Sequence, residues 1–268
     1  NVAAPLRRYA TVAILSPMPN ANFAEPVALG KSGLTVGRLG IGASYGAPAR
    51  AIEAAFERGS NYLYWGSARS DSMGDAIRNI SRKQRDRLVV AIQSYSRSAL
   101  LMRASLERAI RKLGLDRADV LLLGWWNHRP PRRIVDEALR LKERGRVRAL
   151  AISCHHRPMF AEFAKDGIWD VLMCRYNAVH RGAEREVFPL LPSGSPTLLA
   201  YTATRWASLC NPAKTPPGER TPTGSDCYRF VLTHPRVDMA LTGPANEAQM
   251  NEALRALELG PMSPEEQA

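Results

Sequence analysis

The chain lacks closely spaced cysteines and long apolar runs. Its 268 residues include only four cysteines, Cys154, Cys174, Cys210 and Cys227, and no two of them stand in a CxxC spacing. We therefore expect neither a disulfide framework nor a zinc site, and we predict no bound metal. No apolar segment approaches the roughly twenty residues that a membrane span needs, and none resembles a signal peptide. These absences favour a protein of the reducing cytoplasm without a membrane partner.

Acidic residues are scarce relative to basic ones. Asp and Glu number 25 against 37 Lys and Arg, which gives a formal net charge of +12. A basic surface attracts phosphates, so nucleic acid has to be considered as a partner. Most arginines, however, fall on the outward faces of predicted helices, and no segment resembles a nucleic-acid-binding module. We therefore predict no nucleic-acid partner, and expect the positive potential to favour small anionic ligands.

Short apolar runs alternate with segments of helical period. The runs cover residues 88–92, 120–123, 149–152, 171–174, 197–201 and 239–241, and several helical segments end near a glycine. This alternation is typical of βα units around a parallel sheet, and the length suits eight of them. The sequence thus predicts the α/β class, as one (β/α)₈ TIM barrel domain over residues 29–268. Residues 1–28 contain four prolines and are expected to form an N-terminal extension, partly disordered.

Several local motifs follow the order of one known barrel family. They lie in residues 29–42, 59–63, 106–116, 142–153, 176–177 and 241–243. In this order, the chain resembles the aldo-keto reductase superfamily. That resemblance implies reduction of a carbonyl group by a nicotinamide hydride. In the family a tyrosine donates the proton, a lysine and an aspartate tune it, and a histidine orients the substrate.

The four catalytic positions that the resemblance implies hold other residues. Tyr64 stands at the aspartate position, Arg69 at the tyrosine position, Gln93 at the lysine position and Gly124 at the histidine position. A tyrosine with its ordinary pKa of about 10 is a poor acid without a neighbouring cation. Ordinary NADPH-dependent carbonyl reduction is therefore disfavoured.

The cofactor pocket implied by the resemblance is half retained. The retained or candidate cofactor-binding residues are Ser153, Tyr201, Arg205, Gly243 and Gln249. The family's asparagine after the serine is Cys154, its glutamine on the next strand is Met173, and a later asparagine is Ala253. NADP(H) binding remains open on this pattern, and so does weak or absent binding. Packing and turn geometry would also account for Ser153, Tyr201 and Gly243.

The predicted barrel mouth carries polar and aromatic residues of its own. The candidate catalytic residues are Tyr64, Tyr95, His155, Arg175 and His180. A buried guanidinium needs a carboxylate or phosphate, so Arg175 binds either a substrate or an internal acid such as Glu184. The two histidines have the ordinary pKa near 6.5 that suits proton transfer. The candidate substrate-binding residues are Trp65, Gln93, Trp125, Trp126, Asn127, Tyr176 and Asn177.

Three functions fit this sequence. The first is a divergent enzyme that performs acid–base chemistry on an anionic or planar small molecule at the mouth. The second is an NADP-dependent oxidoreductase with a replaced proton donor, and the third is a non-catalytic ligand-binding barrel. The first is preferred, because hydrogen-bonding residues and not apolar ones occupy the mouth.

Overall fold

The computed structural model describes residues 22–66, 69–192 and 196–267. Eight parallel strands close into a barrel in the order β10-β3-β4-β5-β6-β7-β8-β9. The strands are β3 (Leu39–Gly42), β4 (Tyr62–Trp65), β5 (Val89–Ser94), β6 (Val120–Leu123), β7 (Ala149–Ser153), β8 (Val171–Arg175), β9 (Thr197–Tyr201) and β10 (Met239–Thr242). The predicted single-domain (β/α)₈ barrel is confirmed.

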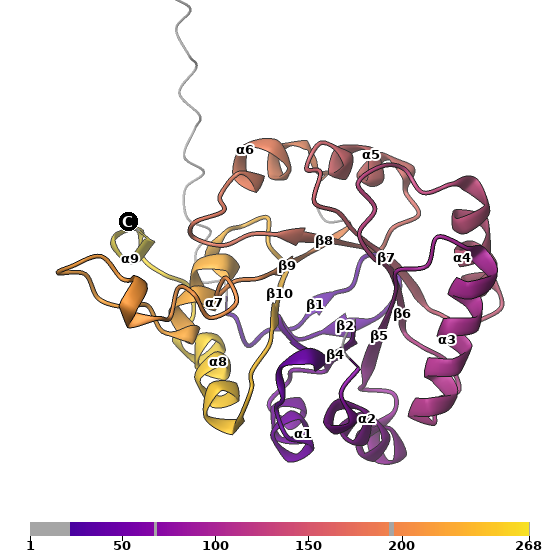
Figure 1. The fold of residues 1–268 in the computed structure, drawn as a ribbon, viewed down its shortest axis with the longest axis horizontal. Coiled ribbons are helices and arrows are strands. Elements are labelled where there is room, and N and C mark those ends of the chain that lie inside the picture. Colours follow the sequence, from indigo (N-terminus) through magenta and orange to yellow (C-terminus); the bar gives the residue numbers. More distant parts are fainter. Residues whose placement is uncertain (1–21, 67–68, 193–195, 268) are drawn as a thin grey trace, which may run out of the picture.

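Helices surround the strands (Figure 1). The α-helices are α1 (Ala49–Glu57), α2 (Asp71–Gln84), α3 (Ala99–Leu113), α4 (Arg132–Glu143), α5 (Met159–Asp166), α6 (Ala183–Glu186), α7 (Gly224–Thr233), α8 (Glu247–Leu259) and α9 (Pro264–Gln267). The 3₁₀ turns are η1 (Ala43–Tyr45), η2 (Phe188–Leu190) and η3 (Pro212–Lys214). Gly114 ends α3 in the left-handed conformation, with φ of 66°. No helix in these ranges is long and apolar enough to cross a membrane.

Successive side chains along each strand point alternately into the barrel and towards the helices, and this divides the core into two layers. On β5, Val89 and Ala91 belong to the barrel interior, whereas Val90 and Ile92 belong to the layer under the helices. The period of two places every second side chain on the same face. Since the strands are parallel, the last inward side chain of each strand points into the same end of the barrel, the mouth. Parity therefore decides which strand-end residues reach a site there.

The opposite end of the barrel, its base, has a repeated polar contact. Asn61, Asp119, Asp170 and Asp238 each directly precede an even-numbered strand. The side-chain oxygen of each accepts a backbone N–H at the start of the preceding barrel strand or, for Asn61, two residues before it. The donors are Gly37 N at 2.9 Å, Val90 N at 2.8 Å, Leu150 N at 2.9 Å and Leu198 N at 2.7 Å. The contact recurs at every second strand and satisfies backbone donors at the edge of the barrel. We refer to these four residues as the base ring.

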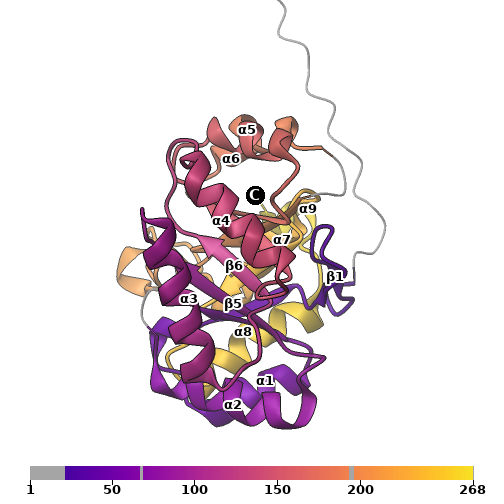
Figure 2. The same ribbon diagram turned by 90° about the vertical axis from the view of Figure 1, so that its right-hand side faces the viewer.

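A two-stranded hairpin closes the base. Strand β1 (Val27–Ala28) pairs antiparallel with β2 (Thr35–Val36), and Leu29, Leu34 and Val36 pack into the barrel interior. Figure 2 shows this hairpin at one end of the barrel. Most of the predicted extension over residues 1–28 lies outside the described residues. Of its described part, Phe23 is buried beneath Arg38, whose guanidinium lies 4.8 Å from the ring centre.

Candidate functional site

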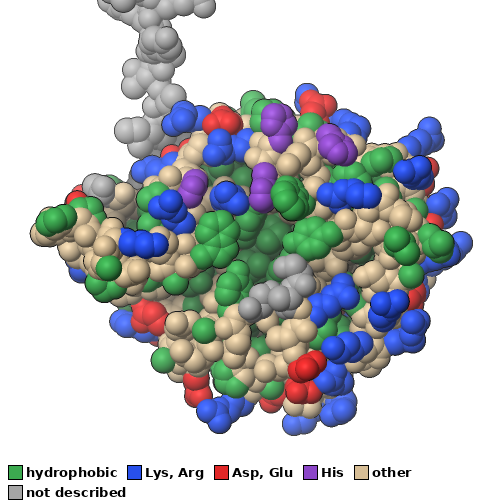
Figure 3. All heavy atoms as spheres, viewed as in Figure 1, with side chains coloured by type: hydrophobic (Ala, Val, Ile, Leu, Met, Phe, Trp, Pro, Cys, Tyr) green, Lys and Arg blue, Asp and Glu red, His purple; other side chains and the backbone are tan. Residues whose placement is uncertain are grey.

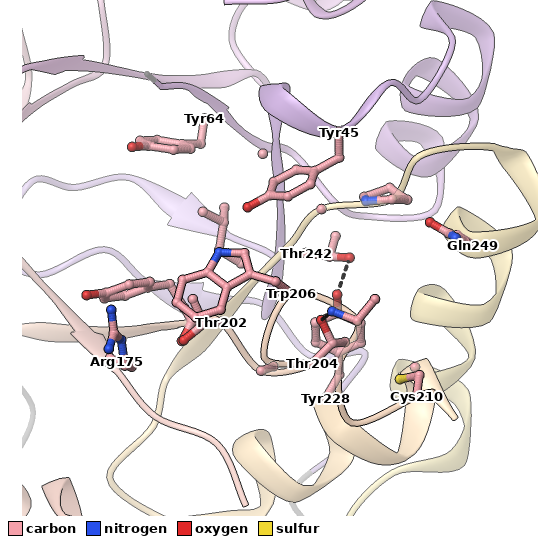
Figure 4. A pocket seen from close by; sticks show the side chains of 18 of the residues that line it. Tyr45, Tyr64, Arg175, Thr202, Thr204, Trp206, Cys210, Tyr228, Thr242 and Gln249 are labelled. Atoms are coloured by element: carbon pink, nitrogen blue, oxygen red, sulfur yellow. Dashed lines mark hydrogen bonds between the residues drawn. The ribbon is translucent and has the colours of Figure 1, made fainter. Parts of the chain in front are cut away.

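A cavity of about 940 Å³ lies at the mouth of the barrel. Its floor contains Tyr64 and Gln93, and its walls come from the ends of the strands and from the segment after β9. Figure 3 shows the mouth as a hollow with hydrophobic side chains inside it and basic side chains around its rim. Figure 4 shows Arg175 and Gln249 on opposite sides of this pocket. The volume lies at the upper end of the usual range for small-molecule sites.

Ten of the residues singled out from the sequence line this cavity. They are Tyr64, Gln93, Tyr95, Trp125, Ser153, His155, Arg175, Tyr201, Gly243 and Gln249. Most of them share one parity. Inward positions 91 and 93 on β5 correspond through β6 to 149 and 151 on β7, and positions 151 and 153 on β7 pair with 171 and 173 on β8. The barrel register thus collects these side chains on one surface.

Three aromatic residues predicted at the mouth lie away from the cavity. Trp65 has the outward parity and packs in the layer under the helices, where Gly74 of α2 lies against its ring. Trp126 is buried in the same layer, with the Arg97 guanidinium 3.9 Å from its ring centre. Tyr176 packs there against Phe188, and its hydroxyl donates a 2.6 Å hydrogen bond to Glu184.

Four polar candidates, Asn127, Asn177, His180 and Arg205, also lie outside the lining, and the two asparagines form hydrogen bonds with lining residues. Asn127 Oδ1 accepts the backbone N–H of His155 at 2.8 Å. Asn177 is fully buried and donates to the Thr202 carbonyl at 2.8 Å, which ties the end of β8 to the segment after β9. The Asn177 side chain also contacts Nδ1 of His180 at 3.1 Å. Arg205 belongs to the segment after β9 but does not line the cavity.

The floor of the cavity is a hydrogen-bonded pair of neutral side chains. The Tyr64 hydroxyl donates to Gln93 Oε1, and burial raises the pKa of Tyr64 well above its usual value. Tyr95 lies beside Gly124, where a Cβ atom would come within 2.2 Å of Gln93 Nε2 and 2.8 Å of the Tyr95 ring. A side chain at position 124 would therefore collide with the floor. The tyrosine hydroxyl is held as a neutral donor.

Arg175 forms one wall of the cavity without a carboxylate partner. Its guanidinium carbon lies 6.0 Å from the ring centre of Tyr201 and 5.3 Å from that of Trp206. No ion pair of the described residues includes it, and the remaining stretches contain no Asp or Glu. Glu184, the internal acid considered above, pairs with Arg181 at 2.9 Å. Arg175 Nε and the Tyr201 hydroxyl are both buried without a hydrogen-bond partner in the described part of the chain.

His155 and Tyr201 lie beside Arg175. Their rings are 6.2 Å apart and nearly parallel, and His155 also lies 5.6 Å from Trp125. Partial burial, and then the charge of Arg175, lowers the pKa of His155 below 6.5, so its imidazole is neutral at neutral pH. Burial raises the pKa of Tyr201 to about 12, although Arg175 opposes that shift. The Ser153 hydroxyl is engaged, because it accepts the backbone N–H of Trp125 at 2.9 Å.

The far side of the cavity is formed by α8 and the start of α7. Gln249 Oε1 accepts the Ala245 N–H at 2.8 Å, and Glu252 accepts a 2.6 Å hydrogen bond from the Ser225 hydroxyl. Burial alone would raise the pKa of Glu252, but hydrogen bonds from Ser225 and Thr223 outweigh it and lower that pKa. The lining residues at this side include no lysine or arginine. The Glu252 carboxylate is paired with Arg255 at 3.3 Å.

The segment after β9 covers the cavity in a strained conformation. Thr202, Arg205, Trp206 and Ala207 all have positive φ, between 49° and 62°, which is unfavourable for residues with a side chain. This backbone places Trp206 at the mouth with 59% of its surface exposed. Further along the segment, Cys210 lines the cavity, and its sulfur lies 3.9 Å from that of Cys227 on α7.

Three lining aromatics, Tyr45, Trp206 and Tyr228, were not identified from the sequence. Tyr228 lies on α7, and its hydroxyl accepts a 2.7 Å hydrogen bond from Thr242. Tyr45 in η1 lies over Gly243, where a Cβ atom would come within 2.4 Å of its ring. Trp206 owes its position to the left-handed backbone described above. The sequence gives no indication of this backbone, because the segment from Thr202 to Ala207 contains no glycine. Tyr45 comes three residues after β3, the first barrel strand, and this position near a strand end was the only indication in the sequence that it could reach the mouth.

The remaining cysteines face the helical layer. Burial raises the pKa of Cys154 to about 11 and that of Cys174 to about 12, so both are thiols at neutral pH. Within residues 22–66, 69–192 and 196–267, no group of three or more His, Cys, Asp or Glu is arranged to hold a metal ion.

Known proteins share this architecture. The structure is similar to the holo form of the aldo-keto reductase AKR11C1 from Bacillus halodurans, with a TM-score of 0.78 and 20% identity, covering 91% of this chain and 94% of that one. The apo form gives a TM-score of 0.76 at 21% identity, over 91% and 93% of the two chains. PA4992 from Pseudomonas aeruginosa, a candidate aldo-keto reductase, gives 0.67 at 21% identity, over 87% and 95%. The sequence profile of the Aldo/keto reductase family matches residues 40–210, well over half of the chain, and the protein therefore belongs to that family.

Proposed function

We propose that this protein is a divergent enzyme of the aldo-keto reductase fold that binds a planar, anionic small molecule at the barrel mouth and acts on it by acid–base chemistry. The observation that carries the proposal is Arg175, a guanidinium in the cavity wall with no carboxylate partner. The Arg175 side chain is only partly buried, so the accessible N–H groups of its guanidinium can donate to acceptor oxygens of a ligand in the cavity.

The aromatic rim supports a planar ligand. Tyr45, Tyr95, Trp125 and Trp206 all line the cavity, and between 46% and 59% of each side chain's surface is exposed. Exposed aromatic side chains gathered around one hollow are characteristic of ligand sites. A flat ring bound between them would place an attached carboxylate or similar group within reach of Arg175.

The proton-transfer groups differ from those of the family. If the resemblance holds position by position, Tyr64, Arg69, Gln93 and Gly124 replace the family's four catalytic residues. The Tyr64 hydroxyl donates to a neutral amide, and burial raises its pKa, so it is a poor proton donor. His155 is the lining residue suited to accept a proton, since its neutral imidazole lies beside Arg175. Arg175 would stabilise the negative charge that remains on the ligand.

The family's cofactor fits the cavity only in part. The cavity runs from Ser153 and Tyr201 to Gly243 and Gln249, the positions that the resemblance assigns to the two ends of the dinucleotide. At the phosphate end, however, the lining offers no cation, and its Glu252 carboxylate is paired with Arg255 at 3.3 Å. No charged lining residue therefore attracts a phosphate there, and the residues present fit NADP(H) only in part. We derive no hydride step from this site.

The test of the proposal is the binding of 2-naphthoate, with neutral 2-naphthamide as the matched probe, measured by calorimetry and tryptophan fluorescence. Wild-type protein should bind the carboxylate more tightly than the amide. Arg175→Gln should weaken carboxylate binding about tenfold or more, as expected for a charge-assisted hydrogen bond of about 1.5–3 kcal/mol, and leave amide binding unchanged. Arg185→Gln on α6 removes the same charge from an exposed site and serves as the control. Equal affinity of the wild type for the two probes would overturn the proposal.

A second candidate function is an NADP-dependent oxidoreductase with a replaced proton donor. The length of the cavity and the position of Tyr201 favour it. Titration with NADPH and NADH, followed by nicotinamide fluorescence, separates the two candidates. Tight binding that is lost in Tyr201→Ala would support the oxidoreductase, whereas no binding at millimolar cofactor would exclude it.

A further inference from the structure

A second cavity, of about 550 Å³, lies beside the mouth. It is lined by the end of β5 and the residues after it, by α3, and by Gly66 and Arg69, which lie between β4 and α2. Its polar lining includes Arg69, Arg108, Ser94, Ser96 and Ser105. Gln93 and Tyr95 line both cavities, so these two side chains form the wall between them. Arg175, the cation of the first cavity, does not reach the second.

The second cavity is positively charged without compensation. No Asp or Glu lines it, and no ion pair of the described residues includes Arg69 or Arg108. The undescribed stretches hold no acidic side chain either. Among the cations of α2 and α3, Arg78 pairs with Asp75 and Lys112 with Asp71 at 3.3 Å, whereas Arg111 has no ion pair among the described residues. What Arg69 and Arg108 share is that both line one hollow whose described lining holds no carboxylate.

The two guanidiniums are close enough to repel each other. Burial, followed by the charge of Arg108, lowers the pKa of Arg69. Within the described residues Arg69 donates one hydrogen bond, to the Gln93 carbonyl at 3.0 Å, and the Arg108 side chain donates none. A guanidinium has five N–H donors, so most of theirs have no acceptor among the described residues. Two like charges held together around a hollow cost free energy unless an anion neutralises them.

We propose that this second cavity is a binding site for the phosphate group of a small phosphorylated molecule. Two guanidiniums supply charge-assisted donors to a tetrahedral, multiply charged anion, and the serine hydroxyls offer further donors. The concave shape and limited volume suit a small molecule. The site is independent of the barrel-mouth ligand, because it uses different cations and is separated from the mouth by Gln93 and Tyr95.

Calorimetric titration with inorganic pyrophosphate at low ionic strength tests the site. The wild type should bind one equivalent, and Arg108→Gln should weaken binding about tenfold or more, on the scale of one lost charge-assisted hydrogen bond. Arg108 is exposed, so its replacement leaves the fold intact, and a thermal melt verifies this. Arg69→Gln is the second variant and should have the same effect.

Two control variants make the result specific. Arg111→Gln, at an exposed position on the same helix and with the same change of net charge, should keep the wild-type affinity within about twofold. Arg175→Gln should also keep it, because that residue belongs to the other cavity. Equal weakening by Arg108→Gln and Arg111→Gln would reveal diffuse charge attraction and overturn the site. Loss of binding in Arg175→Gln would show that pyrophosphate binds at the barrel mouth, and would overturn the proposal. Absence of saturable binding by the wild type would also refute it.

Discussion

Tyrosine rings at the mouth lie against glycines, and this pairing shapes the floor. A Cβ atom at Gly66 would come within 2.2 Å of the Tyr64 ring, and one at Gly124 within 2.8 Å of the Tyr95 ring. The glycines leave the space that the rings occupy, which holds Tyr64 against Gln93. A floor packed this closely has little room for larger side chains.

The contribution of the Tyr64–Gln93 hydrogen bond to stability can be measured by mutation, with Tyr62 as the control. Tyr64→Phe should lower the free energy of unfolding by about 1–2 kcal/mol, because it leaves the buried Gln93 amide without its partner. Tyr62→Phe should be neutral or slightly stabilising, since the Tyr62 hydroxyl is buried with no partner in the described residues. Urea unfolding followed by circular dichroism measures both. Similar losses in the two variants would show that the bond contributes nothing specific.

The residues that reach the mouth could be predicted from strand ends and parity. Gln93, Ser153, Arg175 and Tyr201 lie at the last inward positions of their strands, and the apolar runs located those ends. Trp65 and Tyr176 lie next to inward residues and so point to the opposite face, under the helices. For Trp65 and Tyr176, a position near a strand end wrongly predicted that the side chain lines the cavity, whereas the alternation along the strand predicts the observed outward face.

At the level of elements, the strands depend on polar contacts at the base. Asp119 is fully buried, accepts the Val90 N–H at 2.8 Å and forms a 3.1 Å ion pair with Arg85. Burial raises the pKa of Asp119, and Arg85 opposes the shift. The pair links the start of β6 to β5 and to the residue that follows α2. This single side chain therefore couples two strands and one helix end.

Replacing Asp119 should destabilise the protein strongly. Asp119→Ala removes the buried one of the two carboxylates that pair with Arg85 and leaves the Val90 N–H without its acceptor, and should cost about 3 kcal/mol. Asp119→Asn keeps an acceptor for the N–H and should cost less. Asp86→Ala, at an exposed position whose side chain makes no hydrogen bond or ion pair among the described residues, should change the free energy of unfolding by less than about 0.5 kcal/mol. Chemical denaturation of all three gives the comparison, and equal costs for Asp119→Ala and Asp86→Ala would refute this account.

The order of the elements was predictable, whereas the segment after β9 was not. Apolar runs and helical periods identified most strands and helices, because burial on both faces imposes a strong pattern on a parallel sheet. The segment from Thr202 to Ala207 has no such pattern. Its left-handed residues are held by contacts with distant elements, including the Asn177 hydrogen bond to Thr202. Local sequence carries little information on such a backbone.

At the scale of the whole molecule, the stability should depend on pH through a partly buried histidine. His234 follows α7 and packs against Phe188, with ring centres 4.5 Å apart. Burial lowers the pKa of His234 to about 4. In the unfolded chain its pKa is about 6.5, so between these values the unfolded state binds the proton and the folded state does not.

The free energy of unfolding should therefore fall as pH drops from about 6.5 towards 4, by roughly 1–3 kcal/mol from this residue after allowance for its partial exposure. His234→Asn cannot titrate in this range and keeps an acceptor for the Arg236 N–H, which His234 Nδ1 binds at 3.2 Å. The difference in stability between the wild type and His234→Asn should shrink over this interval. A difference that does not vary with pH would show that His234 titrates normally.

The separation of the base ring from the mouth has a consequence for how this chain can evolve. The hydrogen bonds of Asn61, Asp119, Asp170 and Asp238 to neighbouring strands involve no residue that lines either cavity. Substitutions at the two ends should then act additively on the free energy of unfolding. The mouth is free to exchange one chemistry for another while the base preserves the barrel, so descendants of this protein can acquire new ligands without first acquiring a new fold.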